Sequence, residues 1–528
     1  MSHEQRSNAT DEITSQSASS LGRLIARGDV SAVDVADAHI RRIEQTADDL
    51  NAVVVPRFDQ ALEAARRFDE DRRRRDSPGP LAGVPITVKE MFDVVGTPTT
   101  AGLTALSTHR ADSDATVVAR LRRAGAIILG KTNVSQLGIM PETDNPLYGR
   151  TNNPWNLERS PGGSSGGESA IIAAGGSPLG LGSDSGGSVR QPANSCGICS
   201  IKPTSGRLPL DGHFASANWF ESWPQPGPLA RSVDDLEIAL SVLAGDDPRG
   251  RGPGDAPSLI ADPREIDSRS LRVGFYTDLE GVTSSPAVRR AVCEAAAVLD
   301  DAGATVEEFE LPDAERAWLL YAALFYADGM LDMRRQTRGS RLDWRLKEHF
   351  SYTRLPGWAR RLLARYYALR GQQSTAKVLR TVSRPVLTTA EFLDLVAAQR
   401  AYQRSFAAAL DAAGLDVLIA PVSPLPPLTH GELYANSTML YTALYNLLGV
   451  PAGVVPVTQV RPGEEGHRPV SRDPVEQCCR RVDAGSAGLP IGVQVIARWW
   501  REDLVLAVMQ LLESHFRGTD GFPLRPPI

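Results

Sequence analysis

Two hydrophobic periods alternate along the chain, one typical of strands and one typical of helices. In the segment 81–94, LAGVPITVKEMFDV, Val84, Ile86 and Val88 alternate with other residues, which predicts a strand that ends at or just past Lys89. Short apolar runs predict further buried strands at 126–130, 271–276 and 416–422. Helical spacing predicts helices at 32–46, capped by Ser31, at 61–75, at 115–125, capped by Ser113, and at 286–303. Alternation of strands and helices predicts the α/β class.

A different pattern occupies residues 355–371, LPGWARRLLARYYALRG, which reads as a basic amphipathic helix. Its apolar side carries Trp358, Leu362, Leu363, Tyr366 and Leu369, and its remaining positions include Arg360, Arg361, Arg365 and Arg370. Two interpretations are open. The apolar side docks on a membrane interface, or it packs against the body of the protein, as most amphipathic helices do.

The composition is that of a globular chain rich in turns, with 42% hydrophobic and 23% charged residues, 46 Gly and 37 Pro in 528 residues. A formal net charge of −6 gives no general attraction for nucleic acid, so we expect no nucleic-acid partner. Five cysteines are too few and too unevenly placed for a disulfide framework. Because the N-terminal residues lack the apolar core of a signal peptide, these features predict a cytoplasmic protein.

Three polar segments interrupt the periodic ones. Residues 1–18 read as a polar N-terminal tail, and the Pro/Gly-rich residues 245–257 read as a surface loop. The polar stretch 461–487 is predicted to be a second surface loop.

Two segments, SPGGSSGGESA at 160–170 and LGSDSGGSVRQP at 181–192, surround serines with glycines. Residues 162–166 formally match G-x-S-x-G, but the turn-rich residues before Ser164 exclude the buried strand that this motif requires. In the second segment, Gly186 and Gly187 can turn successive N–H groups toward one point, which would hold an oxyanion beside Ser188. Ser188 is therefore a candidate nucleophile. A glycine-rich loop without chemistry is the other interpretation of either segment.

A serine nucleophile needs a base, and none of the eight histidines lies in either serine segment. Lys89 is the only lysine in the first 130 residues of a chain that otherwise favours arginine, and it ends an apolar strand. Burial lowers the pKa of a lysine far enough to leave a neutral amine near pH 7, whereas arginine does not release its proton. Lys89 is therefore the candidate base.

Five motifs occur in order: GVPITVKE, GKTN, SPGGSSGGESA, LGSDSGGSVRQPANSCGICSIKPT and GLPIGVQVIA. Together they resemble the amidase signature family of serine hydrolases, and within it the chain is most similar to the fatty acid amide hydrolases. The resemblance implies a single domain over 19–528, an amidase signature fold with a large twisted mixed β-sheet sandwiched between α-helices. It also implies a cap-like helical segment at about 340–385 that contains the amphipathic helix.

The resemblance implies a catalytic triad of Lys89, Ser164 and Ser188, in which Ser188 attacks and Ser164, preceded by a cis peptide bond, passes protons to Lys89. The implied oxyanion hole consists of the backbone N–H groups of Ser185, Gly186, Gly187 and Ser188. The residues implied to support these groups are Ser165, Asp184 and Arg190. The residues implied to begin a substrate channel for an acyl chain are Gly138, Ile139 and Met140.

The function that follows is hydrolysis of linear amide C–N bonds in N-acyl amides, such as N-acylethanolamines or primary fatty amides, through an acyl-enzyme. Ser185 stands where the fatty acid amide hydrolases carry a larger apolar residue, so aryl, indole or short aliphatic amides are the main alternative. A third interpretation is the amidase subunit of a transamidase that makes Gln-tRNA. The mechanism requires no cofactor, and Cys196 and Cys199 have no second pair to complete a metal site. The resemblance also implies a homodimer with peripheral membrane contact through 355–371.

Overall fold

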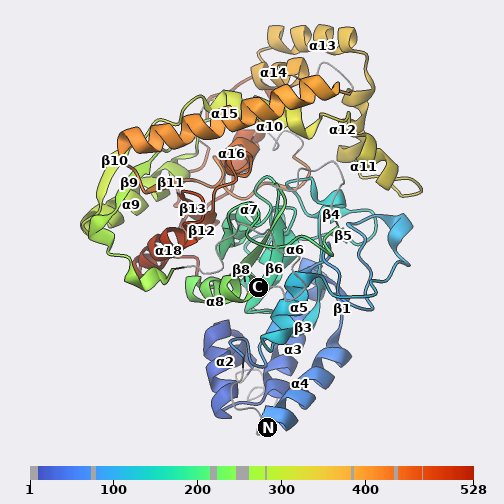
Figure 1. Ribbon diagram of the computed structural model, residues 1–528, viewed down its shortest axis with the longest axis vertical. Helices are drawn as coiled ribbons and strands as arrows, with labels where there is room; N and C mark the ends of the chain where they lie inside the picture. Colours follow the sequence, from blue (N-terminus) through green and yellow to red (C-terminus); the bar gives the residue numbers. More distant parts are fainter. Residues whose placement is uncertain are drawn as a thin grey trace.

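The computed structural model describes residues 10–72, 79–214, 223–244, 261–279, 282–381, 386–432, 438–466 and 468–528. Within these residues, an 11-stranded sheet has the order β1-β3-β2-β6-β8-β7-β12-β13-β11-β9-β10 (Figure 1). Its strands are β1 Val53–Pro56, β2 Pro85–Lys89, β3 Ile127–Thr132, β6 Leu179–Asp184, β7 Cys199–Lys202, β8 Gln225–Ala230, β9 Arg272–Phe275, β10 Thr305–Glu308, β11 Val417–Pro421, β12 Ala452–Gln459 and β13 Pro490–Ala497. A separate hairpin pairs β4 Asp144–Asn145 with β5 Gly149–Arg150.

Parallel and antiparallel pairs are combined in this sheet. Strand β2 runs parallel to both β3 and β6, and β9 runs parallel to β10 and β11, whereas the strands from β6 through β8, β7, β12 and β13 to β11 pair antiparallel. Because the carboxyl ends of neighbouring parallel strands meet at one edge, Lys89 at the end of β2 and Asp184 at the end of β6 lie at the same edge. The sheet topology thus brings together two segments that lie about ninety residues apart in sequence.

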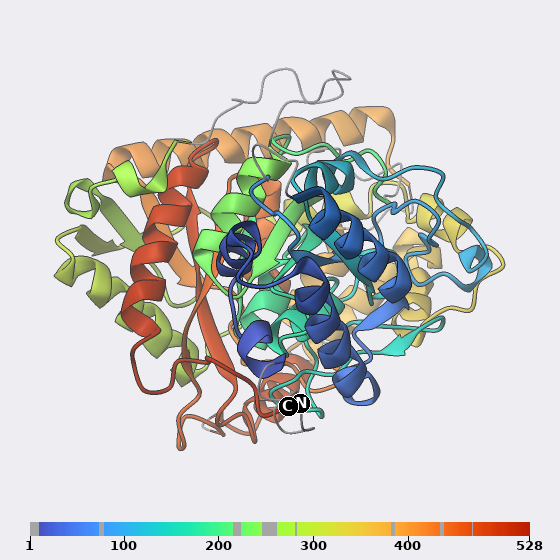
Figure 2. The same cartoon turned by 90° about the horizontal axis from the view of Figure 1, so that it is seen from below.

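Helices cover both faces of the sheet (Figures 1 and 2). The side chains of β11 show why helices are needed on both faces of the sheet. Val417 and Ile419 join one buried apolar cluster, while Leu418 and Ala420 join a second one, as expected when successive strand residues face opposite sides. The first cluster includes residues of α2, α3, α8, α9 and α18, and the second includes residues of α10, α15 and α16. The α/β fold class, with a mixed sheet between helices, is confirmed.

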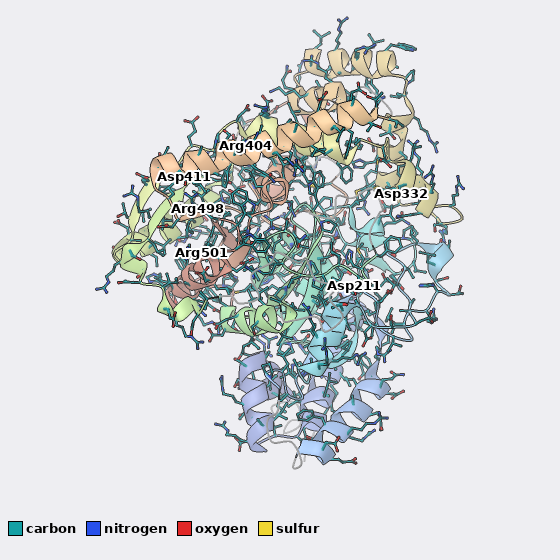
Figure 3. The ribbon with its side chains drawn as sticks, viewed as in Figure 1. Asp211, Asp332, Arg404, Asp411, Arg498 and Arg501 are labelled. Carbon is teal, nitrogen blue, oxygen red and sulfur yellow. The ribbon has the colours of Figure 1, made fainter. Side chains whose placement is uncertain are left out.

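The helices on the first side and around the site are α2 Ala18–Arg27, α3 Ala32–Leu50, α4 Phe58–Arg72, α5 Thr116–Arg123, α6 Gly166–Ala173, α7 Arg190–Cys196, α8 Val233–Leu243, α9 Pro286–Asp301, α17 Pro474–Asp483 and α18 Glu502–Phe516. Those on or above the second side are α10 Ala314–Phe325, α11 Leu331–Gln336, α12 Trp344–Arg354, α13 Gly357–Leu369, α14 Gln373–Thr381, α15 Thr389–Ala413 and α16 Leu440–Leu448. The long helix α15 is tied to the body by an ion pair of 2.7 Å between Asp411 and Arg498, which follows β13 (Figure 3).

Helices α12, α13 and α14 project at one end of the molecule (Figure 1). They occupy the described part of the predicted cap at 340–385, of which residues 382–385 lie outside the described residues. None of the helices in the described part of the chain is long and apolar enough to cross a membrane.

The predicted strands all form, as β2, β3, β9 and β11, and the predicted helix at 32–46 forms as α3 with the side chain of Ser31 as its cap. The expected cap at Ser113 is wrong. Helix α5 begins at Thr116 with Ala115 at the cap position and without a side-chain hydrogen bond. The neighbouring Asp114 instead accepts from the backbone of Val95 and pairs with Arg122, which holds this segment outside the helix.

The predicted loop at 461–487 contains helix α17, so this expectation is also wrong in part. The helix buries Val475, Cys478, Cys479 and Val482 on one side. Because most of its other residues are polar or charged, the overall polarity of the segment did not reveal this short apolar stripe. Of the predicted tail 1–18, residues 1–9 lie outside the described residues. Its later part is packed, because Arg231 donates to the carbonyl groups of Thr14 and Gln16. The loop predicted at 245–257 also lies outside the described residues.

Candidate active site

Lys89 and Ser164 meet at the carboxyl edge of β2. The Nζ atom of Lys89 lies 2.7 Å from Oγ of Ser164, and each residue is only 1% exposed. Ser164 follows a cis peptide bond with Gly163, as the resemblance implied, and stands just before helix α6. Strand β2 thus delivers the lysine, and the turn before α6 delivers the serine. Two of the three predicted catalytic side chains therefore form one buried hydrogen-bonded pair.

Ser188, the predicted nucleophile, lies in the turn between β6 and α7 and is partly exposed. Its carbonyl oxygen accepts a hydrogen bond of 3.2 Å from the backbone of Ser165, which joins the two serine segments. The partial exposure of Ser188 beside a buried Ser164 suits a nucleophile that must meet a substrate.

One of the four predicted oxyanion-hole donors points elsewhere in the structure. The N–H group of Gly187 donates to Oδ1 of Asp184 at 2.7 Å, so it is directed into the protein, contrary to expectation. Among the described residues, the N–H groups of Ser185, Gly186 and Ser188 donate to no protein acceptor. Glycine is required at 187, because its φ is +124° and a Cβ there would lie 2.3 Å from Oγ1 of Thr442.

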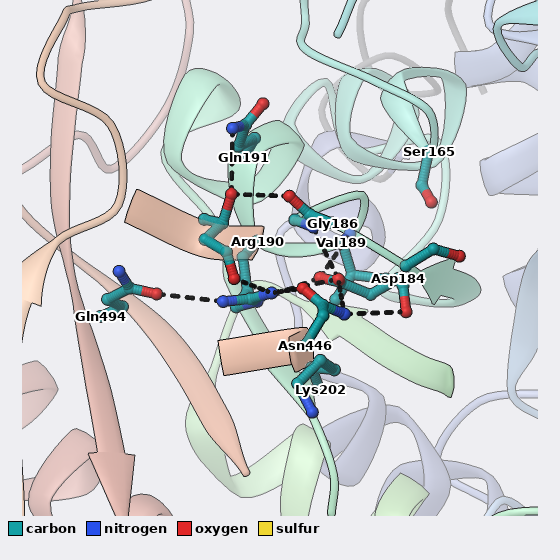
Figure 4. Close-up of polar contacts among 12 residues, drawn as sticks. Ser165, Asp184, Gly186, Val189, Arg190, Gln191, Lys202, Asn446 and Gln494 are labelled. Atoms are coloured by element: carbon teal, nitrogen blue, oxygen red, sulfur yellow. Dashed lines mark hydrogen bonds and ion pairs between the residues drawn. The ribbon is translucent and has the colours of Figure 1, made fainter. Parts of the chain in front are cut away.

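An ion pair beneath this turn holds it in place (Figure 4). Asp184 and Arg190 are fully buried and meet through two hydrogen bonds of 3.1 Å. Arg190 also donates to Asn446 and Gln494, and Asn446 donates to Asp184. Burial opposes ionisation of Asp184, but the charge and hydrogen bonds of Arg190 outweigh it and hold the pKa of this carboxyl well below its usual range. Asp184 and Arg190 thus lie where a supporting role was predicted.

Burial sets the protonation of the groups under Ser164. It lowers the pKa of Lys89 to about 7, against the opposing charges of Asp184 and Glu168, so a neutral amine is accessible near neutral pH. Burial also raises the pKa of Glu168 to about 8, although Thr87 and Thr132 both donate to its carboxyl group. The sequence analysis passed over Glu168, since nothing in the glycine-rich segment marks it as a neighbour of Lys89.

The predicted substrate segment lies directly beside Ser164. A Cβ built on Gly138 would lie 3.5 Å from Oγ of Ser164, and Gly138 has a φ of +69°. Met140 is buried and Ile139 is partly buried, and both belong to one apolar cluster that extends to Leu346 and Phe350 of α12. Ser165, predicted to support the serines, lies 3.3 Å from the carbonyl oxygen of Ser183 through its Oγ atom.

Two polar residues that the sequence analysis missed form a chain of contacts that leads to Lys89. Oγ of Ser183 lies 3.0 Å from Nζ of Lys89, and Nε2 of His213 lies 2.9 Å from the same Oγ. The only signal in the sequence was the place of Ser183 near the end of a strand that leads into the glycine turn. No signal linked His213 to it, because the two residues are thirty positions apart.

Cys196 and Cys199 are both buried as free thiols, and burial raises the pKa of each well above its usual value. Helix α7 ends at Cys196 and β7 begins at Cys199, so both pack in the core. The described residues contain no group of His, Cys, Asp and Glu that could hold a metal ion.

Together, fold and site describe an α/β enzyme with a serine–lysine centre at the carboxyl edge of its sheet. Comparison with known proteins identifies the family: a family model described as Amidase matches residues 34–506, and the chain belongs to the amidase signature family. It is therefore a hydrolase-family enzyme that acts on amide C–N bonds.

The relatives carry two different names. A glutamyl-tRNA(Gln) amidotransferase subunit from Symbiobacterium thermophilum is 34% identical over 529 residues, covering 97% of this chain and 98% of that protein. Fatty-acid amide hydrolase 1 from Sus scrofa is 36% identical over 444 residues, covering 82% of this chain and 76% of that protein. A solved structure of fatty acid amide hydrolase has a TM-score of 0.83 at 24% identity, covering 97% of this chain and 86% of that chain, which concerns the fold alone.

Proposed function

We propose that this protein hydrolyses N-acyl amides with a long apolar acyl group to a carboxylic acid and an amine or ammonia. The observation that carries the hydrolytic part is the buried contact of 2.7 Å between Lys89 and Ser164 beside the partly exposed Ser188. A lysine whose pKa is about 7 can accept a proton near neutral pH, which a serine nucleophile needs.

In the proposed mechanism, Oγ of Ser188 attacks the amide carbonyl carbon. Its proton passes to Oγ of Ser164, and the proton of Ser164 passes to the neutral Nζ of Lys89. The N–H groups of Ser185, Gly186 and Ser188 hold the negative oxygen of the tetrahedral intermediate. Ser164 then gives a proton to the leaving nitrogen and recovers one from Lys89, so the C–N bond breaks and an acyl-enzyme remains. Water attacks the acyl-enzyme with the same proton transfers and releases the acid.

An apolar acyl group is supported by the surroundings of Ser164. The cluster that begins at Ile139 and Met140 leads away from the serine to α11 and α12, with Phe325 and Tyr326 packed against it. A long acyl chain that enters between these side chains would contact them along its length, and each buried CH₂ contributes about 0.8 kcal/mol. A short or aryl acyl group would contact only the part next to Ser164.

The exposed side of helix α13 in the cap supports the proposal that the enzyme takes its substrates from a membrane. On α13, Trp358, Leu362, Tyr366 and Leu369 are 66%, 62%, 50% and 89% exposed, so this apolar stripe faces away from the body. Arg360 and Ala364 are buried instead and face the inside, and Arg361, Arg365 and Arg370 are exposed beside the stripe. We therefore propose that α13 lies on an anionic membrane surface, with its apolar stripe in the acyl region. We also propose that the protein forms a homodimer, as the resemblance implied.

The experiment that tests the function is hydrolysis of one amine's N-acyl amides with two to about twenty acyl carbons, by the purified chain and by Ser188→Ala. We expect kcat/KM to rise with chain length for the wild type and to vanish in Ser188→Ala. A preference for short or aryl acyl groups would keep the mechanism and replace the substrate class. Activity that survives in Ser188→Ala would overturn the mechanism.

A second candidate rests on the similarity to the glutamyl-tRNA(Gln) amidotransferase relative, which extends over nearly the whole chain. A protein in that role would hydrolyse an amide to supply ammonia to a partner protein. The exposed apolar stripe of α13 and the cap have no evident use in that role, and for this reason we place it second. Assays of the purified chain with glutamine alone and with a fatty amide alone distinguish the two, because in the second role glutamine would be a good substrate and the fatty amide a poor one.

A further inference from the structure

His213 lies beside the catalytic lysine because two loop segments pair through their backbones. Asp93 donates to the carbonyl of Gly212, and Phe214 donates to the carbonyl of Met91, each at 2.7 Å. This pairing fixes His213 just beyond the end of β2, and its ring packs edge-on against Phe92 at 4.7 Å between ring centres. The imidazole is therefore held by residues that closely follow Lys89 in the chain.

A chain of short contacts runs from this imidazole to the lysine. Nε2 of His213 lies 2.9 Å from Oγ of Ser183, and this Oγ lies 3.0 Å from Nζ of Lys89. Nδ1 of His213 is buried and makes no hydrogen bond within the described residues, so Ser183 is the only partner shown for the ring nitrogens. Burial, assisted by the charge of Lys89, lowers the pKa of His213 to about 3, so the ring is neutral at neutral pH.

The donors and acceptors then have one arrangement that suits catalysis. A neutral amine has two N–H donors and one lone pair. The two donors can be given to the carbonyl and the Oγ of Ser183, at 3.2 and 3.0 Å, which leaves the lone pair for Ser164 at 2.7 Å. Ser183 can accept from the lysine only if its own proton is directed elsewhere, and Nε2 of His213 is an acceptor in reach in the tautomer that carries the ring proton on Nδ1.

We propose that His213, with its ring proton on Nδ1, is a positioning residue that accepts a hydrogen bond from the hydroxyl of Ser183 and so keeps the lone pair of Lys89 free to receive the proton of Ser164. Without this acceptor, the hydroxyl of Ser183 turns its proton to the lysine and occupies that lone pair. The inference rests on the proposed function, because it concerns the proton relay through Lys89.

The test compares His213→Leu, which removes the acceptor, with His213→Gln, whose amide oxygen can replace it. A fluorophosphonate that labels an activated serine is the probe, so the result does not depend on knowledge of the natural substrate. We expect His213→Leu to lower the second-order labelling rate at pH 8.5 on the order of tenfold, and His213→Gln to retain most of the rate. His39→Leu is the matched control: it removes another neutral imidazole, one that is fully buried and bonded to the carbonyl of Val35 on α3, and should leave the rate unchanged.

The pH dependence separates positioning from loosened packing. The carboxyl groups that raise the pKa of Lys89 when they are ionised are Asp184 and Glu168, and both remain in the variant. Loss of the His213 acceptor weakens Ser183 as an acceptor for the lysine ammonium, so the pKa of Lys89 falls and the acid limb of the labelling profile moves to lower pH. Loosened packing admits water and moves this limb to higher pH instead. A limb that stays or moves upward overturns the inference.

A double-mutant cycle completes the test. Because His213 acts through Ser183, adding His213→Leu to Ser183→Ala should change the labelling rate less than twofold. Independent losses would multiply and contradict the inference. Failure of the proposed function has a different signature, since Lys89→Ala would then label as fast as the wild type.

Discussion

Lys89 ends strand β2 with its Nζ atom 2.7 Å from Oγ of Ser164, and both side chains are shielded from water. This relationship joins a strand and a glycine-rich turn that no local pattern connects. It also predicts how variants at these two positions change catalysis.

Lys89→Ala removes the proton acceptor, and Ser164→Ala interrupts the path to it, so each should lower kcat by at least about a hundredfold. Ser188→Ala removes the nucleophile and should abolish acyl-enzyme formation altogether. Mass spectrometry after fluorophosphonate treatment tests this directly, because Ser188→Ala should carry no label. A label that persists on that variant would assign the nucleophile to another residue.

The pKa of Lys89 near 7 predicts the pH profile. The neutral amine is the active form, so kcat/KM should rise with pH, change about tenfold per pH unit below 7, and reach a plateau above about 8. His213, with its pKa lowered to about 3, should add no limb between pH 5 and 9. Lys89→Arg is the informative control: it keeps a positive charge but offers no neutral form, and it should be inactive at every pH in this range. A profile without an acid limb near 7 would exclude Lys89 as the base.

The pair of Asp184 and Arg190 predicts a large cost in stability. Asp184→Asn leaves the guanidinium of Arg190 buried without its counter-charge, which should lower the free energy of unfolding by about 3–5 kcal/mol. The pair of Arg27 and Asp29, with side chains 65% and 53% exposed, is the matched control, and Asp29→Asn should cost less than about 1 kcal/mol. Urea unfolding of the two variants gives both numbers. Equal costs would mean that the buried pair does not support the turn as we describe.

The apolar stripe of α13 predicts membrane binding that depends on charge. Leu362→Ser combined with Leu369→Ser removes apolar surface worth about 3 kcal/mol, so partitioning onto phosphatidylglycerol-containing vesicles should fall about a hundredfold. Leu393→Ser on α15, where the leucine is 59% exposed, is the control and should bind as the wild type does.

Added salt, or vesicles of phosphatidylcholine alone, should weaken the binding of the wild type. Sedimentation with vesicles measures the partitioning, and hydrolysis of a water-soluble amide confirms that the catalytic centre is intact. If the double variant instead changes the oligomeric state without changing vesicle binding, the stripe is an interface between two copies of the chain.

Local sequence patterns were sufficient to predict elements that depend only on residues close in sequence. The alternation of Val84, Ile86 and Val88 predicted β2, and Ser31 predicted the start of α3, because a strand face or a cap depends on residues within a few positions. Where a competing partner comes from farther away, the same reasoning failed. Asp114 bonds to Val95 and Arg122, and Ser113 therefore does not cap α5.

The sequence by itself determined the α/β class, the family, and the identity of Lys89, Ser164 and Ser188 as candidates, since these depend on residue types and order. Only the tertiary structure decided that Gly187 directs its N–H group to Asp184, that His213 reaches Lys89 through Ser183, and that the apolar side of α13 faces outward. The physical reason is common to all three. Each depends on a contact, or on the absence of a covering surface, that arises when segments distant in sequence pack around the same sheet.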